Sequence, residues 1–171
     1  KLGPAARAAA PILARKLNDK VSRVRAAAVD GLGKTAGDDV TYAALFATAL
    51  NADEASVRIA ATRVLSKLPA IATAAAENLV AALVDEDEHV RAGAARALGV
   101  GGKDIAASVP ALVQQLGDPV DEVRVEIVRA LGATGETTPG VIAELGATIA
   151  DPSPKVRRQG VLTLRLAPIH S

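Results

Sequence analysis

Few residues in this 171-residue chain are of types that carry chemistry. Cysteine is absent, which excludes disulfides, thiolate metal sites and cysteine nucleophiles. His89 stands in an acidic loop and His170 near the C-terminus, and neither belongs to a cluster with metal-ligand spacing. The carboxylates gather in short loops, where helix capping explains them and no EF-hand spacing supports calcium binding. We therefore expect a protein that is not an enzyme and has no cofactor and no metal site.

The most regular polar pattern is an arginine that follows a valine once every 33 residues. Loop aspartates stand six residues before most of these arginines, so each guanidinium can reach loop carboxylates or carbonyls of its own or the adjoining repeat. We expect this ladder to be structural, with ligand contact as the alternative. Its predicted members are Asp19, Arg25, Arg58, Asp85, Arg91, Asp118, Arg124, Asp151 and Arg157. The second repeat has Ala52 at the aspartate position, and Asp53 beside it is the expected substitute.

A second periodic position, five residues after each ladder arginine, varies more and is the candidate binding site. Its occupants are Asp30, Arg63, Arg96, Arg129 and Leu162. On a helix this position lies roughly opposite the apolar stripe, so the three arginines are expected to project together as a basic strip in a groove. One helical turn earlier come the expected groove floor residues, Ile59, Ala92 and Val125. Such a surface would suit an acidic or phosphorylated peptide, or an acidic face of a partner domain. A solvated charged face that binds nothing is the alternative.

Two apolar stripes in each repeat predict the helices that must position these side chains. In the first helix, large apolar residues recur four residues apart, which places them on one face. These pairs are Leu13 and Leu17, Phe46 and Leu50, Leu79 and Leu83, Leu112 and Leu116, and Leu145 and Ile149. In the second helix, the first repeat carries Val24, Ala28 and Leu32, and the pattern recurs in the others. The expected helix pairs are 4–18/20–33, 41–51/53–67, 73–84/86–99, 106–117/120–132 and 139–150/153–166.

One helix pair of this size cannot bury both of its stripes, so neighbouring repeats must stack on one another. Half of the residues are apolar, and the alanine-rich second helices suit a close approach. We predict an all-α fold, a right-handed α-solenoid of about five two-helix repeats. The predicted array is a single domain over residues 1–171, with units at approximately 1–37, 38–70, 71–103, 104–136 and 137–171.

The segments DEDEHVRAGAARALG and DPVDEVRVEIVRALG resemble the second helix and preceding loop of short HEAT-like repeats, of the type also found in phycobilin lyase subunits. The resemblance extends over all five repeats and implies a structural role for the Asp–Arg ladder. The fifth repeat is the weakest match, because Gly160, Thr163 and Arg165 replace Ala, Ala and Gly, and we expect fraying there. The ankyrin and tetratricopeptide signatures are absent. The opening KLGPAARAAAPIL is similar to the end of a preceding repeat, which suggests a piece of a longer protein.

These observations favour a non-catalytic scaffold that binds a protein or a neighbouring domain through the concave face, which the second helices are expected to line. An accessory module of a lyase or hydrolase is the alternative, and nucleic-acid binding through the arginines is the third hypothesis. The formal net charge of +1 gives no support to a nucleic-acid or membrane partner. No secretory signal and no long apolar run is recognisable, and no small-molecule substrate is implied. The cellular compartment stays undetermined.

Overall fold

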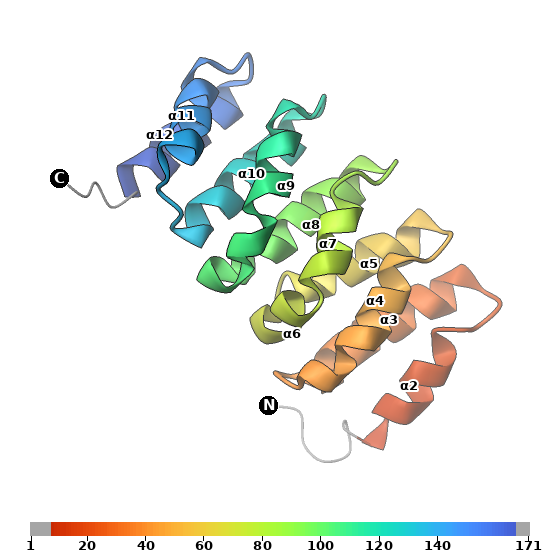
Figure 1. Ribbon diagram of the computed structural model, residues 1–171. Coiled ribbons are helices and arrows are strands. Elements are labelled where there is room, and N and C mark those ends of the chain that lie inside the picture. The colour runs from red at the N-terminus through yellow and green to blue at the C-terminus, as the bar shows by residue number, and fades with distance from the viewer. Residues whose placement is uncertain (1–7, 167–171) are drawn as a thin grey trace.

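The computed structural model describes residues 8–166, which form helices joined by short loops and contain no strand (Figure 1). Helical segments alternate between two layers. The first layer, called A here, comprises α2 (Ala10–Lys16), η1 (Val40–Tyr42), α4 (Ala43–Leu50), α6 (Pro69–Ala74), α7 (Ala76–Ala82), η2 (Gly102–Ser108), α9 (Val109–Gln114), η3 (Gln115–Gly117), α11 (Pro139–Ala147) and η4 (Thr148–Ala150). The second layer, called B, comprises α3 (Ser22–Ala36), α5 (Ala55–Leu65), α8 (Glu88–Val100), α10 (Asp121–Thr134) and α12 (Pro154–Leu166).

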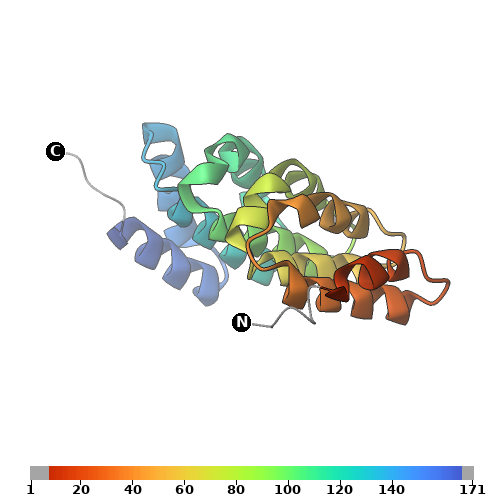
Figure 2. The ribbon, with the colours of Figure 1, turned by 90° about the horizontal axis from the view of Figure 1, so that it is seen from below.

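Each A segment and the B helix after it form a unit, and successive units stack side by side into a right-handed α-solenoid (Figures 1 and 2). The fold class predicted from the sequence is confirmed. Figure 2 shows the two ends of the array far apart, with α2 and α3 at one end and α12 at the other. Within residues 8–166, no helix is both long and apolar enough to cross a membrane.

The A segments are more broken than the expected continuous helices. The predicted helix over 73–84 is two short helices, with α6 beginning at Pro69 and a break at Ala75. The predicted helix over 106–117 is three segments: the end of η2, then α9, which begins just before Pro110, and then η3. Proline favours the first turn of a helix because it has no N–H to donate, so these positions start helices.

Close packing between B helices depends on small residues. A Cβ on Gly99 would lie 3.2 Å from the backbone Cα of Ala130 in the next B helix, and one on Gly93 would collide with the Thr62 hydroxyl. The stripe leucines of the first four units, Leu32, Leu65, Leu98 and Leu131, are fully buried. The core is thus continuous from unit to unit, as stacking requires.

Two residues expected in the apolar stripes, Val24 and Ile149, are exposed instead. Both belong to the end units of the described chain. The equivalents of Val24 in the other four units are buried, and so are Leu17, Leu50 and Leu83, which are equivalent to Ile149. Within residues 8–166 each end unit has a neighbour on one side only, and these two positions are not covered there.

Replacing Leu98 with Ala should lower the free energy of unfolding by about 2–5 kcal/mol, because it empties a fully buried site between units. Leu164→Ala should cost less, since Leu164 is half-buried in the end unit. Urea unfolding followed by circular dichroism compares the two variants. Equal losses would contradict the weaker packing of the fifth unit.

Candidate functional site

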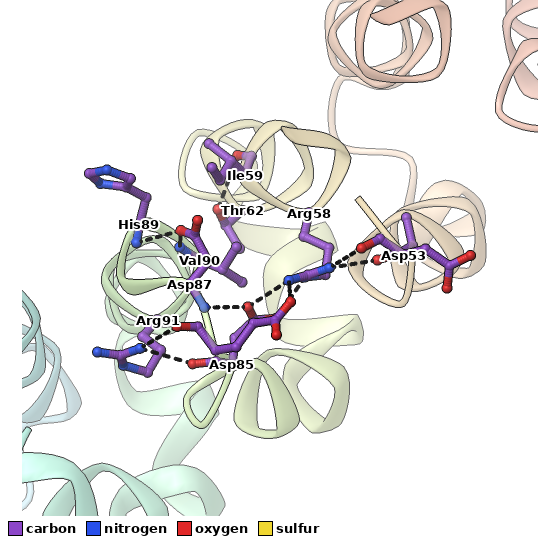
Figure 3. Close-up of polar contacts among 11 residues, drawn as sticks. Asp53, Arg58, Ile59, Thr62, Asp85, Asp87, His89, Val90 and Arg91 are labelled. Carbon is purple, nitrogen blue, oxygen red and sulfur yellow. Dashed lines mark hydrogen bonds and ion pairs between the residues drawn. The ribbon is translucent and has the colours of Figure 1, made fainter. Parts of the chain in front are cut away.

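The periodic arginines join consecutive units through loop aspartates (Figure 3). Arg91 Nε donates to Asp118 Oδ2 at 2.7 Å, and its Nη2 donates to Oδ1 at 3.2 Å. Arg124 binds Asp151 in the same two-pronged manner, with both distances at 2.8 Å. Arg58 Nη2 donates to Asp85 Oδ1 at 2.9 Å and also reaches Glu86. In each case the carboxylate belongs to the loop of the following unit, a partner choice that the sequence pattern left open.

Each ladder arginine also binds its own loop. The Nη1 atom donates to the backbone carbonyl six residues earlier in all five units. The loop aspartate accepts, in turn, from the backbone N–H two residues later, for example Val120 N to Asp118 Oδ1 at 2.8 Å. One guanidinium therefore fixes two consecutive loops at the same time, which sets the spacing of the units.

The second unit departs from the pattern, because Ala52 supplies no carboxylate. Arg25 pairs with Glu54 instead. Asp53, the substitute expected from the sequence, is exposed and contributes its backbone carbonyl to Arg58. That expectation was wrong, because Glu54 and not Asp53 forms the ion pair with Arg25.

Pairing stabilises the charged forms of Asp151 and Arg91. The hydrogen bond from Arg124 holds the pKa of Asp151 below its ordinary value of 3.8, and the hydrogen bond to Asp118 raises the pKa of Arg91. A carboxyl group whose pKa is lower in the folded state contributes stability above its unfolded pKa, and this contribution disappears as the pH falls through the folded pKa. The Arg124–Asp151 pair therefore stabilises the protein at neutral pH and is lost only in acid.

Arg63, Arg96 and Arg129, called the outer row here, are exposed. Each of their guanidinium groups already forms an ion pair with a carboxylate of the chain. Arg63 Nη2 lies 2.8 Å from both oxygens of Asp30, one unit earlier. Arg96 and Arg129 both donate to Glu126, at 3.0 Å and 2.7 Å, and the Glu126 side chain is only 2% exposed. The row is thus a set of ion pairs along the B helices rather than the bare basic strip expected from the sequence.

Glu126 is the residue that sequence reasoning missed. The equivalent positions in the preceding units hold Ala27, Ala60 and Gly93, so the repeat pattern marks this as a small packing position. The glutamate is accommodated because α8 and α10 bring Arg96 and Arg129 to the same point. The one available signal was an acidic residue three positions before an arginine on a predicted helix.

The predicted groove floor offers little surface. Ala92 and Val125 are buried, and Ile59 is half-buried against the core. A groove does occur beside Arg63, between the C-terminal ends of α3 and α5. It has a volume of about 380 Å³ and is lined by Asp30, Gly33, Lys34, Arg63, Val64, Lys67 and Leu68.

The remaining polar candidates have local roles. Asp87 caps α8 by accepting from the backbone N–H groups of His89 and Val90. His89 is exposed, and His170 lies outside the described residues. Within the described range, no three histidine, aspartate or glutamate side chains are grouped to hold a metal ion. The fully buried Phe46 and half-buried Tyr42 both pack against the core.

Comparison with known proteins agrees with this geometry. The family model for HEAT repeats matches residues 76–165, more than half of the chain. The chain belongs to the HEAT repeat family. No curated protein matches this HEAT chain in a sequence search.

Several solved structures share the fold of this HEAT array. The complex of CpcE and CpcF of phycocyanin lyase from Nostoc sp. superposes with a TM-score of 0.79 at 22% identity, covering 94% of this chain and 65% of that one. A designed armadillo repeat protein in complex with the peptide (KR)4 has a TM-score of 0.71 at 17% identity, covering 93% and 81%. An engineered protein has a TM-score of 0.70 at 21% identity, covering 94% and 79%. At these identities the likeness concerns the fold alone.

Replacing Arg96 or Arg129 singly with Ala should cost little, because Glu126 keeps one guanidinium in each variant. Replacing both should cost about 1–3 kcal/mol more than the sum of the single losses, since a buried carboxylate is then left without a cation. Chemical unfolding of the three variants measures the difference. In a Glu126→Gln background the two replacements should be additive, and additivity in the native background would refute the shared pairing.

Proposed function

We propose that this HEAT array is a non-catalytic scaffold that holds an acidic segment of a partner protein against the exposed side of its B helices. The observation that carries the proposal is the groove beside Arg63. Three cations, Lys34, Arg63 and Lys67, surround it with one carboxylate, Asp30, and with apolar surface from Val64 and Leu68. A peptide with carboxylates and small apolar side chains complements this mixture.

An acidic ligand can bind in this groove without breaking a strong interaction within the chain. Lys34 and Lys67 are exposed and form no ion pair with any residue in the described part of the chain. The Arg63–Asp30 pair is itself exposed, and such pairs contribute only about 0–1 kcal/mol, so an incoming carboxylate can displace Asp30. Arg96 and Arg129 differ, because the buried Glu126 stays in place and leaves them only their remaining N–H donors. Binding is therefore expected to concentrate at the Arg63 end.

The comparisons support an interaction role in general terms. One similar structure is a designed repeat protein with a bound peptide, and another is a complex of two different subunits. The second of these favours one further candidate, an accessory module of a lyase or hydrolase. In that case the array would bind its catalytic partner through the same surface. Nucleic-acid binding has less support, because the arginines of the outer row are mostly neutralised by carboxylates of the chain.

The test is a calorimetric titration with a synthetic peptide of alternating Glu and Ala, and with the matching Lys and Ala peptide as the probe control. The triple variant Lys34→Gln, Arg63→Gln, Lys67→Gln should bind the acidic peptide about tenfold more weakly, because three exposed charge contacts are lost. The matched variant Arg15→Gln, Lys20→Gln, Lys103→Gln removes the same charge elsewhere and should bind normally. Equal weakening in both variants would contradict a localised site and indicate a general charge effect.

A further inference from the structure

A second groove lies in the A layer, between α9 of the fourth unit and α11 of the fifth (Figure 1). It has a volume of about 460 Å³, and its apolar lining includes Val109, Pro110, Val113 and Val141. Val109 and Val141 belong to the hydrophobic core and are each 7% exposed. All lining residues come from A segments or from the loop before α11, so this groove and the groove beside Arg63 belong to different layers.

Two carboxylates line the α9–α11 groove without a cation of the chain to pair with them. Glu136 and Glu144 form no ion pair within residues 8–166. The Glu136 side chain accepts a hydrogen bond from the backbone N–H of Thr138 at 3.2 Å, which holds this carboxylate beside the first turn of α11. The groove therefore combines apolar surface with negative charge that the described chain leaves unpaired.

The surrounding sequence supplies no compensating charge. No lysine or arginine occurs from 104 to 123 or from 130 to 154, the stretches that contain α9 and α11. Lys103 lies beside Gly135, in the loop before α11, but forms no ion pair within residues 8–166. A cation that pairs with the two glutamates must therefore come from a ligand or from the solvent.

A related groove between the first two units shows that the hollow recurs with the repeat and that its chemistry does not. That groove is smaller, with a volume of about 310 Å³. Tyr42 and Leu45 line it at the positions that Val141 and Glu144 occupy three repeat periods later. An aliphatic side chain thus stands where the α9–α11 groove has a carboxylate, and the α9–α11 groove is the better match for a cationic ligand.

Gly140 leaves room for a ligand at the start of α11. This residue lines the groove, and a Cβ built on it would meet no heavy atom of its surroundings within 4 Å. A large side chain at this position would therefore fill space that a ligand needs, without colliding with the rest of the chain.

We propose that the α9–α11 groove binds a basic segment of a partner protein, with a large apolar side chain of the segment in the groove and flanking lysines or arginines paired with Glu136 and Glu144. Charge complementarity decides the occupant, because an acidic segment would be repelled by the two carboxylates. Contact with the valines of the groove supplies affinity, and the exposed charge pairs supply mainly specificity. This site takes a ligand of the opposite charge to the one proposed for the Arg63 groove, so it goes beyond the function proposed above.

The test is a calorimetric titration with a capped synthetic peptide, Lys-Lys-Leu-Leu-Lys-Lys, at about 0.15 M ionic strength, where long-range charge effects are largely screened. The wild-type protein should bind this peptide with a Kd of about 1 mM or tighter. A peptide with Ala in place of Leu, and one with Glu in place of Lys, should each bind about tenfold more weakly, because one loses the apolar contact and the other the charge pairing.

Two pairs of substitutions separate a local site from a general charge effect. Glu136→Gln combined with Glu144→Gln should weaken binding of the lysine–leucine peptide about three- to tenfold, since two exposed charge pairs are lost. Asp38→Asn combined with Glu88→Gln removes the same charge from exposed positions outside the groove and should leave binding unchanged. Equal weakening by the two pairs overturns the proposal.

Two glycine substitutions on α11 test the groove itself. Gly140→Leu should weaken binding about tenfold because the new side chain occupies the groove, whereas Gly146→Leu, where a Cβ also meets open space, should bind normally. Circular dichroism confirms that both variants stay folded. The triple variant without the cations of the Arg63 groove should bind this peptide normally, which separates the proposal from the proposed function. Absence of binding to the wild type at about 1 mM peptide, or binding that Gly140→Leu leaves unaltered, overturns the proposal.

Discussion

At each junction between the second and fifth units, one guanidinium is held by two loops at once. It donates to a backbone carbonyl six residues earlier and to the aspartate carboxylate of the next unit. The groups are largely shielded from water, so loss of either partner leaves a charge without compensation. Because the contact reaches from a helix N-terminus to a neighbouring loop, it fixes the distance and rotation between units. The apolar stripes supply the driving force for stacking, and the ladder selects one register.

The same close stacking determines what the B face can offer to a partner. Helices held this near to one another bring Arg63, Arg96 and Arg129 within reach of a carboxylate on an adjacent turn or helix. A row that looks basic in the sequence is therefore mostly neutralised in the fold. Lys34 and Lys67 beside the Arg63–Asp30 pair form no ion pair within the described residues, so their positive charge is not neutralised. The proposed contact therefore lies at the Arg63 end of the B-helix face.

The repeat period was sufficient to predict the solenoid, the B helices and the ladder positions, because these follow from local spacing and recur in register. The breaks in the A segments were not predictable from the stripes alone, since Pro110 fits a helix start as well as a surface position. The exposure of Val24 and Ile149 depends on how neighbouring units cover these positions within residues 8–166, which the local pattern does not report. Glu126 depends on two arginines from different helices meeting at one point, and only the tertiary structure shows this.

The most direct test of the ladder as the contact that couples units is a double-mutant cycle on Arg91 and Asp118, with Arg91→Gln, Asp118→Asn and the double variant compared by chemical unfolding. The account predicts a coupling free energy of about 1.5–3 kcal/mol, as for hydrogen bonds to charged groups with little exposure. The same cycle on the exposed pair Arg63 and Asp30 should give less than about 1 kcal/mol. Equal coupling for the two pairs, or none between Arg91 and Asp118, would contradict it.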